Sequence, residues 1–527
     1  MSDILLSAFN TLFRLEGDLD NHCQAIAENR NGIANLSQAN KTYVRDQIKN
    51  FLTHENNLEQ QLPLSIFNLS IYASYLHDEQ IDHYIHKVFN KISGLKNKNA
   101  FIYNLVTIGF RKNISFDKPL AKIFNSFVMQ FKDEYSDLTL KYDVNQNKKT
   151  ILLVSSQILS ANHSPTFLLL ELYETLIELG FEVLIAQIQC YPPEYILPVI
   201  EPIKGNYLDT PEGLRIWEFD GKEIPVYNLA ANHFKKSSLE DFLETLEKIK
   251  PGFMINVGGY NVFQEFIASY IPSLIYTTSS MLVPSPFSSL VSVFEKLSSA
   301  QIKALEDAQI DPKKYKKMVS QAAQVDSLLG KKTTSKSEFG YKAEEILLAV
   351  VSNRLDWEIG PDEIEFINKT LQIDPRIKFL LVGRCEDKLV TKIGQMCGPR
   401  AECLGPIVEI KTFLSMIDFL INTKRLGGGG AAATAIGHGT PVFSINYGDV
   451  ASLLPSEYLA DNYAEILGLI TCHLELDKPT RQQIAYSIFN QFPKFKDNVK
   501  SLIKALAWKH RKDRINAVNQ RSQSLVN

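Results

Sequence analysis

The chain has 527 residues, of which 45% are hydrophobic and 22% are charged, and its formal net charge at pH 7 is −3. This length predicts two or three domains, and the composition is typical of globular proteins with large buried cores. The slightly negative balance speaks against nucleic acid as a partner, because nucleic-acid binders usually carry a basic excess or a basic stripe.

The sequence also indicates where the protein works. No apolar run approaches the ~20 residues of a membrane-spanning helix, which leaves only peripheral contact with a membrane open. The first residues, MSDILLSAFNTLFRLEGD, lack a basic region and reach acidic residues too early for a signal peptide. The six cysteines are scattered without a CxxC pair, which argues against a disulfide framework or a zinc site. We therefore expect a cytoplasmic protein.

Residues 1–147 have a helical texture with few glycines. Residues 61–84, for example, space their apolar side chains as amphipathic helices do. The polar run at 142–149 (YDVNQNKK) is typical of a linker. We predict an all-helical domain over residues 1–147.

An α/β region is predicted over residues 148–335. A buried, parallel-type strand at 150–156 is followed by a loop, a helix at 167–179 that ends at Gly180, and a second strand at 181–186. This strand–helix–strand order is the opening of a doubly wound sheet. A further strand, at 252–257, runs into Gly258 and Gly259.

A second unit of the same kind is predicted over residues 336–505. It follows a Lys-, Ser- and Thr-rich run at 330–337 (GKKTTSKS) that reads as an interdomain linker. Its first strands are expected at 346–351 and 379–383. Residues 506–527 are expected to form a basic and polar tail.

The most informative stretch is residues 418–449, DFLINTKRLGGGGAAATAIGHGTPVFSINYGD. A strand at 419–421 precedes four glycines (Gly427, Gly428, Gly429 and Gly430), and a helix at 431–436 follows them. Glycines between a strand and a helix leave backbone N–H groups bare at the positive end of the helix, where a phosphate can bind closely. A tight packing turn is the alternative. The Gly-Lys-Ser/Thr of a P-loop and the G-x-G-x-x-G spacing are both missing.

Three features of this stretch resemble the donor-binding segment of the GT-B-fold nucleotide-sugar glycosyltransferases. They are Asp418, the glycine run, and the turn Gly439-Thr440-Pro441-Val442. In the retaining branch of this superfamily, two glutamates would fall at Leu426 and Thr434, and both are missing here. The departure implies an inverting mechanism.

The resemblance covers about residues 150–505. It implies a GT-B-like fold, with two doubly wound, Rossmann-like lobes facing a cleft behind the all-α N-terminal domain. Some bacterial protein N-glycosyltransferases carry an all-helical domain in that place, and we expect residues 1–147 to bind the acceptor or a partner. It further implies transfer of a hexose from a nucleotide-sugar donor, with UDP-linked sugars expected, to a protein or glycan acceptor.

Several residues are candidates for the donor site. Arg354 matches the basic residue that family members place after the first strand of this lobe, against the donor diphosphate. An ion pair of Arg354 with Asp356 or Glu358 is the alternative. Asp449 matches acidic residues that accept hydrogen bonds from the ribose or the sugar, and an N-cap for a helix at 450–454 is the alternative.

The other basic candidates near the donor are weaker. His438 could face the phosphate, or it could be a turn histidine without a role. Arg384 replaces the usual Asp or Glu of the family, which weakens it as a candidate. Lys424 and Arg425 could reach a phosphate, although a solvated loop charge is the commoner role for such residues.

His163 is the candidate catalytic base. It lies in the loop after the first strand of the N-terminal lobe, where inverting GT-B enzymes place a histidine or an aspartate. A neutral imidazole there could take the proton of the acceptor hydroxyl, whereas the alternative is a bystander histidine. Asn162 and Thr166 would line the same cleft, and so would Gly258 and Gly259 unless they only permit a turn.

The sequence has no H-E-x-x-H motif and no Asp-x-Asp in the sheet region. We therefore expect neither a metal ion nor a cofactor, with the nucleotide sugar as co-substrate. Two other functions remain open. One is a nucleotide-sugar epimerase, which would need a set of carboxylates around the sugar that is not evident. The other is a catalytically silent protein that binds a sugar nucleotide or a partner.

Overall fold

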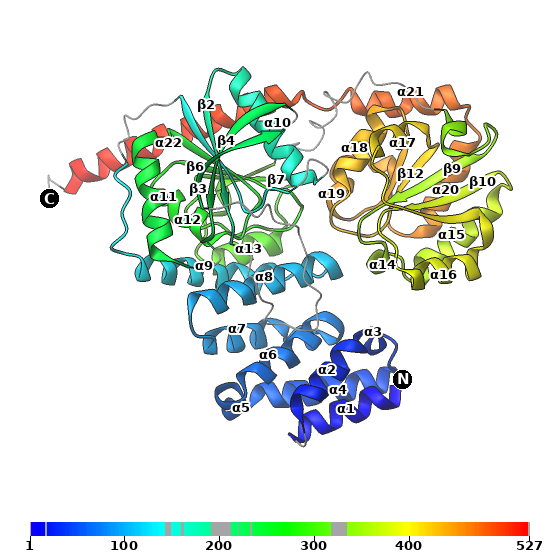
Figure 1. The fold of residues 1–527 in the computed structure, drawn as a ribbon, viewed down its shortest axis with the longest axis horizontal. Coiled ribbons are helices and arrows are strands. Elements are labelled where there is room, and N and C mark those ends of the chain that lie inside the picture. Colours follow the sequence, from blue (N-terminus) through cyan, green and yellow to red (C-terminus); the bar gives the residue numbers. More distant parts are fainter. Residues whose placement is uncertain are drawn as a thin grey trace.

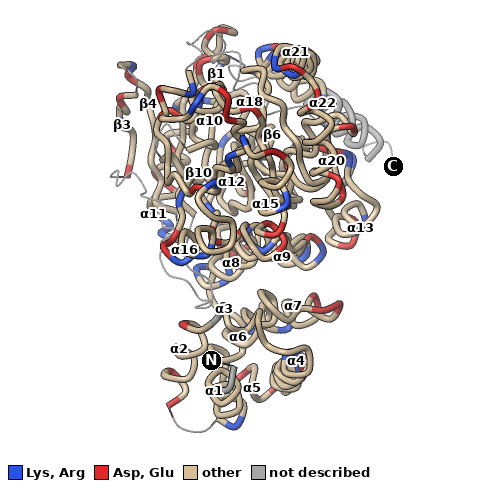
Figure 2. Tube along the Cα trace, turned by 90° about the vertical axis from the view of Figure 1, so that its right-hand side faces the viewer, with Lys and Arg blue, Asp and Glu red and all other residues tan. Residues whose placement is uncertain are grey.

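The computed structural model describes residues 2–15, 18–142, 149–159, 163–190, 212–219, 221–231, 234–317 and 335–524. Two α/β lobes lie side by side, and a helical region extends from the first of them (Figure 1). Lys and Arg are interspersed with Asp and Glu along the elements in the view of Figure 2. Of the helices in these residues, none combines the length and the apolar character that crossing a bilayer requires. Asn162 and most of both predicted linkers lie outside the described residues.

The predicted helical region is confirmed. Its helices are α1 (Ser2–Arg14), α2 (Leu19–Glu28), α3 (Arg30–Ile33), α4 (Gln38–Thr53), α5 (Glu55–Gln60), α6 (Leu62–Ile71), α7 (Ile81–Lys91), α8 (Leu95–Lys112) and α9 (Asp117–Glu134). The amphipathic pattern expected at 61–84 is wrong for α6, where every residue from Leu64 to Ile71 is buried. The reason is that α6 packs between α4, α5 and α7.

The first lobe contains an eight-stranded sheet in the order β3-β4-β2-β1-β5-β6-β7-β8, with all pairs parallel except β3 and β4. Its strands are β1 (Thr150–Ser155), β2 (Glu182–Ile188), β3 (Gly213–Phe219), β4 (Lys222–Leu229), β5 (Phe253–Val257), β6 (Ser273–Tyr276), β7 (Leu290–Val293) and β8 (Tyr315–Lys317). Its helices are α10 (Ser164–Glu178), α11 (Lys236–Ile249), α12 (Val262–Ala268) and α13 (Ser299–Asp307).

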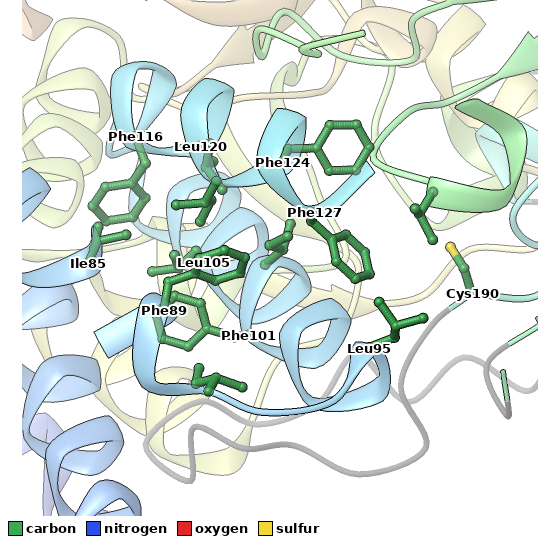
Figure 3. Packing of buried hydrophobic residues seen from close by; sticks show 14 of the residues in the cluster. Ile85, Phe89, Leu95, Phe101, Leu105, Phe116, Leu120, Phe124, Phe127 and Cys190 are labelled. Atoms are coloured by element: carbon green, nitrogen blue, oxygen red, sulfur yellow. The ribbon is translucent and has the colours of Figure 1, made fainter. Parts of the chain in front are cut away.

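Side chains of β1 point alternately to the two faces of the sheet, so they contribute to two separate core clusters. Ile151 and Leu153 pack with α10 on one face, whereas Leu152 and Val154 pack with α11, α12 and the helical region on the other. The apolar packing continues without a break from the second face into α8 and α9 (Figure 3). The ring of Phe131, on α9, lies 4.8 Å from the ring of Phe263 on α12. The helical region and the first lobe therefore share one core.

The second lobe contains a six-stranded parallel sheet in the order β11-β10-β9-β12-β13-β14. Its strands are β9 (Ile346–Val351), β10 (Ile377–Val382), β11 (Ala401–Gly405), β12 (Phe419–Asn422), β13 (Val442–Ile445) and β14 (Leu459–Ala460). Its helices are α14 (Leu355–Glu358), α15 (Pro361–Ile373), α16 (Asp387–Cys397), α17 (Ile410–Met416), α18 (Gly429–Gly437), α19 (Gly448–Ala451), α20 (Tyr463–Leu474) and α21 (Lys478–Phe489). The predicted pair of Rossmann-like lobes is confirmed.

The last helix, α22 (Phe495–Ser524), returns to the first lobe, as Figure 1 shows. Phe495, Val499 and Leu502 pack in the same core cluster as Ile151 and Leu153 of β1. The predicted boundary of the second unit at residue 505 is therefore wrong, because its last residues belong to the core of the first lobe. The expected tail continues the same helix.

Candidate functional site

The glycine run lies between β12 and α18, as predicted. Gly427 and Gly428 have φ angles of 96° and 88°, a region that side chains other than glycine rarely occupy. Gly429 opens α18, and no side chain in the described residues caps that helix end. The first helical N–H groups therefore point out of the helix end unsatisfied by the helix itself, as an anion site requires.

Close packing also restricts Gly428 to glycine. A Cβ there would lie 2.8 Å from both Arg425 Nη2 and Asn422 Oδ1, and a Cβ on Gly427 would lie 3.2 Å from Arg354 Nη2. The turn thus packs tightly against two arginines, as the packing alternative expects. The end of α18, uncapped by any described side chain, is also compatible with a phosphate site.

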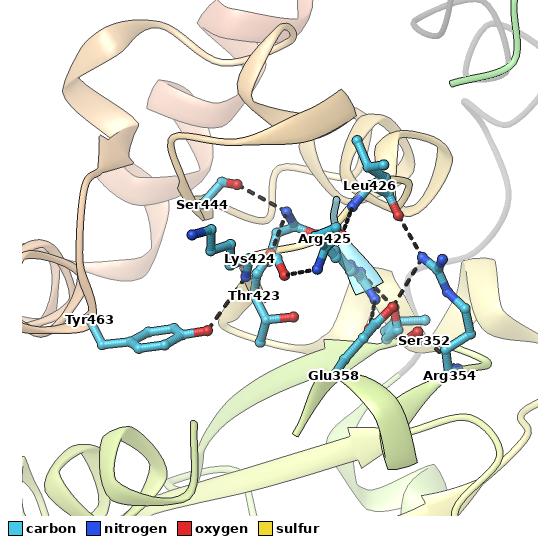
Figure 4. Close-up of polar contacts among 12 residues, drawn as sticks. Ser352, Arg354, Glu358, Thr423, Lys424, Arg425, Leu426, Ser444 and Tyr463 are labelled. Carbon is cyan, nitrogen blue, oxygen red and sulfur yellow. Dashed lines mark hydrogen bonds and ion pairs between the residues drawn. The ribbon is translucent and has the colours of Figure 1, made fainter. Parts of the chain in front are cut away.

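Arg425 is buried and holds the loop in place (Figure 4). Its Nη1 pairs with Glu358 Oε2, its Nη2 donates to the carbonyl of Val351, and its Nε donates to Asn422 Oδ1, each at 2.8 Å. The expectation of a solvated loop charge, or of a group that reaches a phosphate, is wrong because three acceptors already occupy the guanidinium. Arg425 ties the loop before the glycines to the end of β9.

Replacing Arg425 with alanine should destabilise the fold by about 3 kcal/mol, because Glu358 would lose one of its two partners inside the protein. Urea unfolding measures this free energy. Arg376→Ala is the matched control, since Arg376 forms an exposed pair with Asp374 and its removal should change little. Equal effects of the two substitutions would contradict the structural role of Arg425.

Arg354 lies beside Gly427. Its Nη2 is 3.0 Å from Glu358 Oε1 and donates to the carbonyl of Leu426 at 2.5 Å, and its guanidinium stacks on the ring of Phe110 at 4.3 Å. The ion pair with Glu358 is confirmed, whereas Asp356 instead accepts a hydrogen bond from the backbone of Glu386. Burial lowers the pKa of Arg354, which Glu358 opposes. The guanidinium is positioned next to the bare helix end.

Asp449 joins the two lobes. It is buried on α19, and its Oδ1 accepts a hydrogen bond of 2.7 Å from the backbone N–H of Ser280, which follows β6 of the first lobe. Burial raises the pKa of its carboxyl group. The backbone N–H of Gly427 and the charge of Arg354 oppose this rise, so the carboxyl group also lies beside the glycine run. The expected alternative of an N-cap is wrong, because Tyr447 occupies the cap position.

Of the remaining candidates of this lobe, His438 and Asp418 lie apart from the glycine run. His438 follows the last residue of α18, so the nine-residue helix separates it from the glycines by ~13 Å. This separation favours the alternative of a turn histidine without a role. Arg384 and Lys424 are exposed after β10 and β12. Asp418 holds Lys336 at 2.6 Å and the backbone of Leu347 at the opposite edge of the sheet.

His163 precedes α10 in the first lobe, and Thr166 orients it. The His163 Nδ1 atom lies 2.9 Å from Thr166 Oγ1, which also accepts a hydrogen bond from the backbone of Leu159. Burial lowers the pKa of His163 to about 4, so its ring is neutral at physiological pH. The same helix end faces the second lobe, because Lys411 Nζ of α17 lies 4.9 Å from the ring of Phe167.

Gly258 and Gly259 follow β5, as expected. Gly258 has a φ angle of 120°, and a Cβ on Gly259 would overlap the side chain of Val283. Both observations favour the simpler alternative, in which the pair permits a turn and a close approach of the chain.

Sequence reasoning missed Asn113, at the end of α8. Its side chain forms hydrogen bonds of 3.0 Å with the backbone of Lys424 and with the backbone of Leu426. Asparagine is a common end residue of a helix, so the sequence contained a signal for a cap. It contained no signal for a contact between Asn113 and Leu426, which are 313 positions apart in the chain. Among the described residues, no three His, Cys, Asp or Glu side chains gather as a metal-binding group.

Comparison with known proteins identifies the fold. No protein-family model and no curated protein matches the sequence. A mutant O-GlcNAc transferase from Thermobaculum terrenum is similar in structure, with a TM-score of 0.57 and 10% identity over 98% of each chain. A protein described as a UDP-N-acetylglucosamine 2-epimerase from Listeria monocytogenes has a TM-score of 0.44 and 12% identity, over 68% of this chain and 96% of that one. The chain has the two-lobe GT-B fold.

Proposed function

We propose that this protein is a glycosyltransferase that moves a sugar from a nucleotide-sugar donor to a protein or glycan acceptor. The observation that carries the proposal is the bare N-terminal end of α18, which follows two left-handed glycines and lies beside the guanidinium of Arg354. A diphosphate suits this place, because bare amides, the helix dipole and a guanidinium all favour an anion. The GT-B fold of the chain supports the proposal.

In the proposed reaction, an oxygen or nitrogen atom of the acceptor attacks the anomeric carbon of the sugar. The bond from that carbon to the diphosphate oxygen breaks, and the electron pair leaves with the nucleotide. The amides of α18 and Arg354 stabilise the charge that develops on the diphosphate, without a metal ion. Neutral His163 takes the proton of the acceptor. We propose UDP-linked hexoses as donors and the cytoplasm as the location.

A panel of UDP-, GDP-, ADP- and CMP-linked sugars tests the proposal. Calorimetry should detect binding of one nucleotide class, and acceptor-free hydrolysis of the bound donor should release the free sugar. Absence of binding across the panel would contradict a donor site at α18. Binding without hydrolysis or transfer would favour a catalytically silent binding protein. Two contacts within the protein keep this second function in view, because Arg354 pairs with Glu358 and Asp449 accepts a hydrogen bond from Ser280.

We further propose that transfer inverts the anomeric configuration. Neither position that carries a glutamate in the retaining branch offers a carboxylate here. Thr434 Oγ1 donates to the carbonyl of Gly430 within α18, and the carbonyl of Leu426 accepts from Arg354. With a donor of known anomer, the NMR coupling of the anomeric proton in the product should report inversion. Retention would show that a different group stabilises the anomeric centre.

A further inference from the structure

The C-terminal end of α8 lies against the loop that precedes the glycine run. Asn113 Nδ2 donates to the carbonyl of Lys424 and Asn113 Oδ1 accepts from the N–H of Leu426, both at 3.0 Å. The hydroxyl of Tyr447 donates to the carbonyl of Asn113 at 3.4 Å. One side chain thus satisfies a donor and an acceptor of the same loop, which fixes its position and its orientation.

The backbone of Asn113 makes this contact geometrically possible. Asn113 has a φ angle of 55°, and its N–H closes α8 on the carbonyl of Gly109. Asparagine tolerates this left-handed conformation better than most residues, so one residue both ends the helix and reaches across to the loop. The loop is then held from two sides, by Arg425 from within its own lobe and by Asn113 from the helical region.

The residues before Asn113 contact the other half of the candidate donor site. The ring of Phe110 supports the Arg354 guanidinium, and the guanidinium of Arg111 stacks on Trp357 at 4.5 Å. The last turn of α8 and its cap residue Asn113 therefore contact two segments beside the glycine run. One segment follows β9 and the other follows β12. A rigid helix of eighteen residues links these contacts to the core of the helical region.

We propose that Asn113 is a positioning residue that holds the glycine loop in its donor-binding geometry, so that donor affinity depends on the helical region. The inference rests on the proposed function and revises the expectation that residues 1–147 serve only the acceptor or a partner.

The substitution Asn113→Gly tests this directly, because glycine keeps the left-handed backbone and removes only the side chain. We expect the Kd for the bound nucleotide sugar to rise about 10-fold, as loss of two hydrogen bonds to the loop predicts. Lys250→Gly is the matched control: Lys250 is an exposed residue in the same conformation, at the end of α11. It should leave the Kd unchanged.

A second measurement does not require a donor. The N–H of Leu426 donates to Asn113 Oδ1, so hydrogen exchange in a peptide covering residues 419–428 should be faster in Asn113→Gly than in the wild type. Asn113→Asp keeps the acceptor and should retain the slow exchange. An unchanged exchange rate, or an unchanged Kd in folded Asn113→Gly, would overturn the inference. If the wild type binds no nucleotide sugar, the proposed function fails, and the exchange rate alone decides whether Asn113 holds the loop.

Discussion

Replacing Gly428 with valine is expected to abolish binding of the nucleotide sugar. Gly428 has a φ angle of 88°, which costs a β-branched residue about 1–3 kcal/mol. Its Cβ would also meet Arg425 Nη2 and Asn422 Oδ1 at 2.8 Å, so the arginine that holds the loop would have to move. That movement would displace the loop before α18, where the diphosphate binds in the proposed site. Calorimetry with the best donor of the panel measures the effect.

Backbone strain alone has to be separated from loss of the site, and Gly340 offers the control. It lies in the same lobe with φ and ψ angles of 82° and 11°, in the left-handed region like Gly428, and a Cβ there would meet nothing within 4 Å. Gly340→Val should therefore cost a comparable strain and keep donor affinity. Circular dichroism checks that both variants are folded. Wild-type affinity in a folded Gly428→Val variant would refute a diphosphate site at the glycine run.

Local features of this protein could be predicted from its sequence. The strands at 150–156 and 346–351, the glycine turn and the two-lobe plan depend on interactions between residues close in the chain. A buried parallel strand needs a continuous apolar run, and a left-handed turn needs glycine, so both leave a direct mark. The helical N-terminal region was evident for the same reason. Its shared core with the first lobe was not, because apolar periodicity does not say what covers a helix face.

Contacts between distant segments decided the predictions that failed. Arg425 looks like a loop charge in sequence, but Glu358 and the carbonyl of Val351 make its burial favourable. Asp449 looks like a helix cap in sequence, but Tyr447 takes the cap position and Asp449 accepts a hydrogen bond from Ser280 in the other lobe. His438 looks close to the glycines in sequence, yet the intervening helix carries it away from them. These outcomes depend on how elements pack, which a single sequence does not contain.

The structure strengthens one candidate that the sequence left without support. His163 had no evident partner in sequence, whereas Thr166 Oγ1 now lies 2.9 Å from its Nδ1 atom and fixes the ring. A ring whose Nδ1–H donates to Thr166 carries its lone pair on Nε2, which lies 3.4 Å from the side-chain amide nitrogen of Gln157. This is the tautomer that a base requires. Removing a general base typically lowers the rate ~10²–10⁴-fold. His163→Ala should therefore lower turnover by that order and leave donor affinity nearly unchanged.

The pH dependence of the rate provides an independent check on His163. Burial lowers the pKa of His163 to about 4, so the ring of the folded protein takes up its proton only near that pH. With His163 as the base, kcat/KM should stay level as the pH falls from 7 to about 5 and should decline towards pH 4. The unfolded chain, in contrast, binds this proton near the ordinary histidine pKa of ~6.5. Because only the unfolded chain binds this proton between about pH 6.5 and about pH 4, the free energy of unfolding should fall as the pH is lowered through this range.

His86 is the matched control for this prediction. It is a half-buried histidine on α7, outside both lobes, and burial lowers its pKa as well. His86→Ala should keep both the turnover and the acid limb of the rate profile, whereas His163→Ala should lose the turnover. Any residual activity of His163→Ala should no longer show the decline near pH 4, because the group that titrates has been removed. A His163→Ala enzyme with most of its turnover would assign the proton transfer to another group, with a carboxylate of the first lobe as the next candidate.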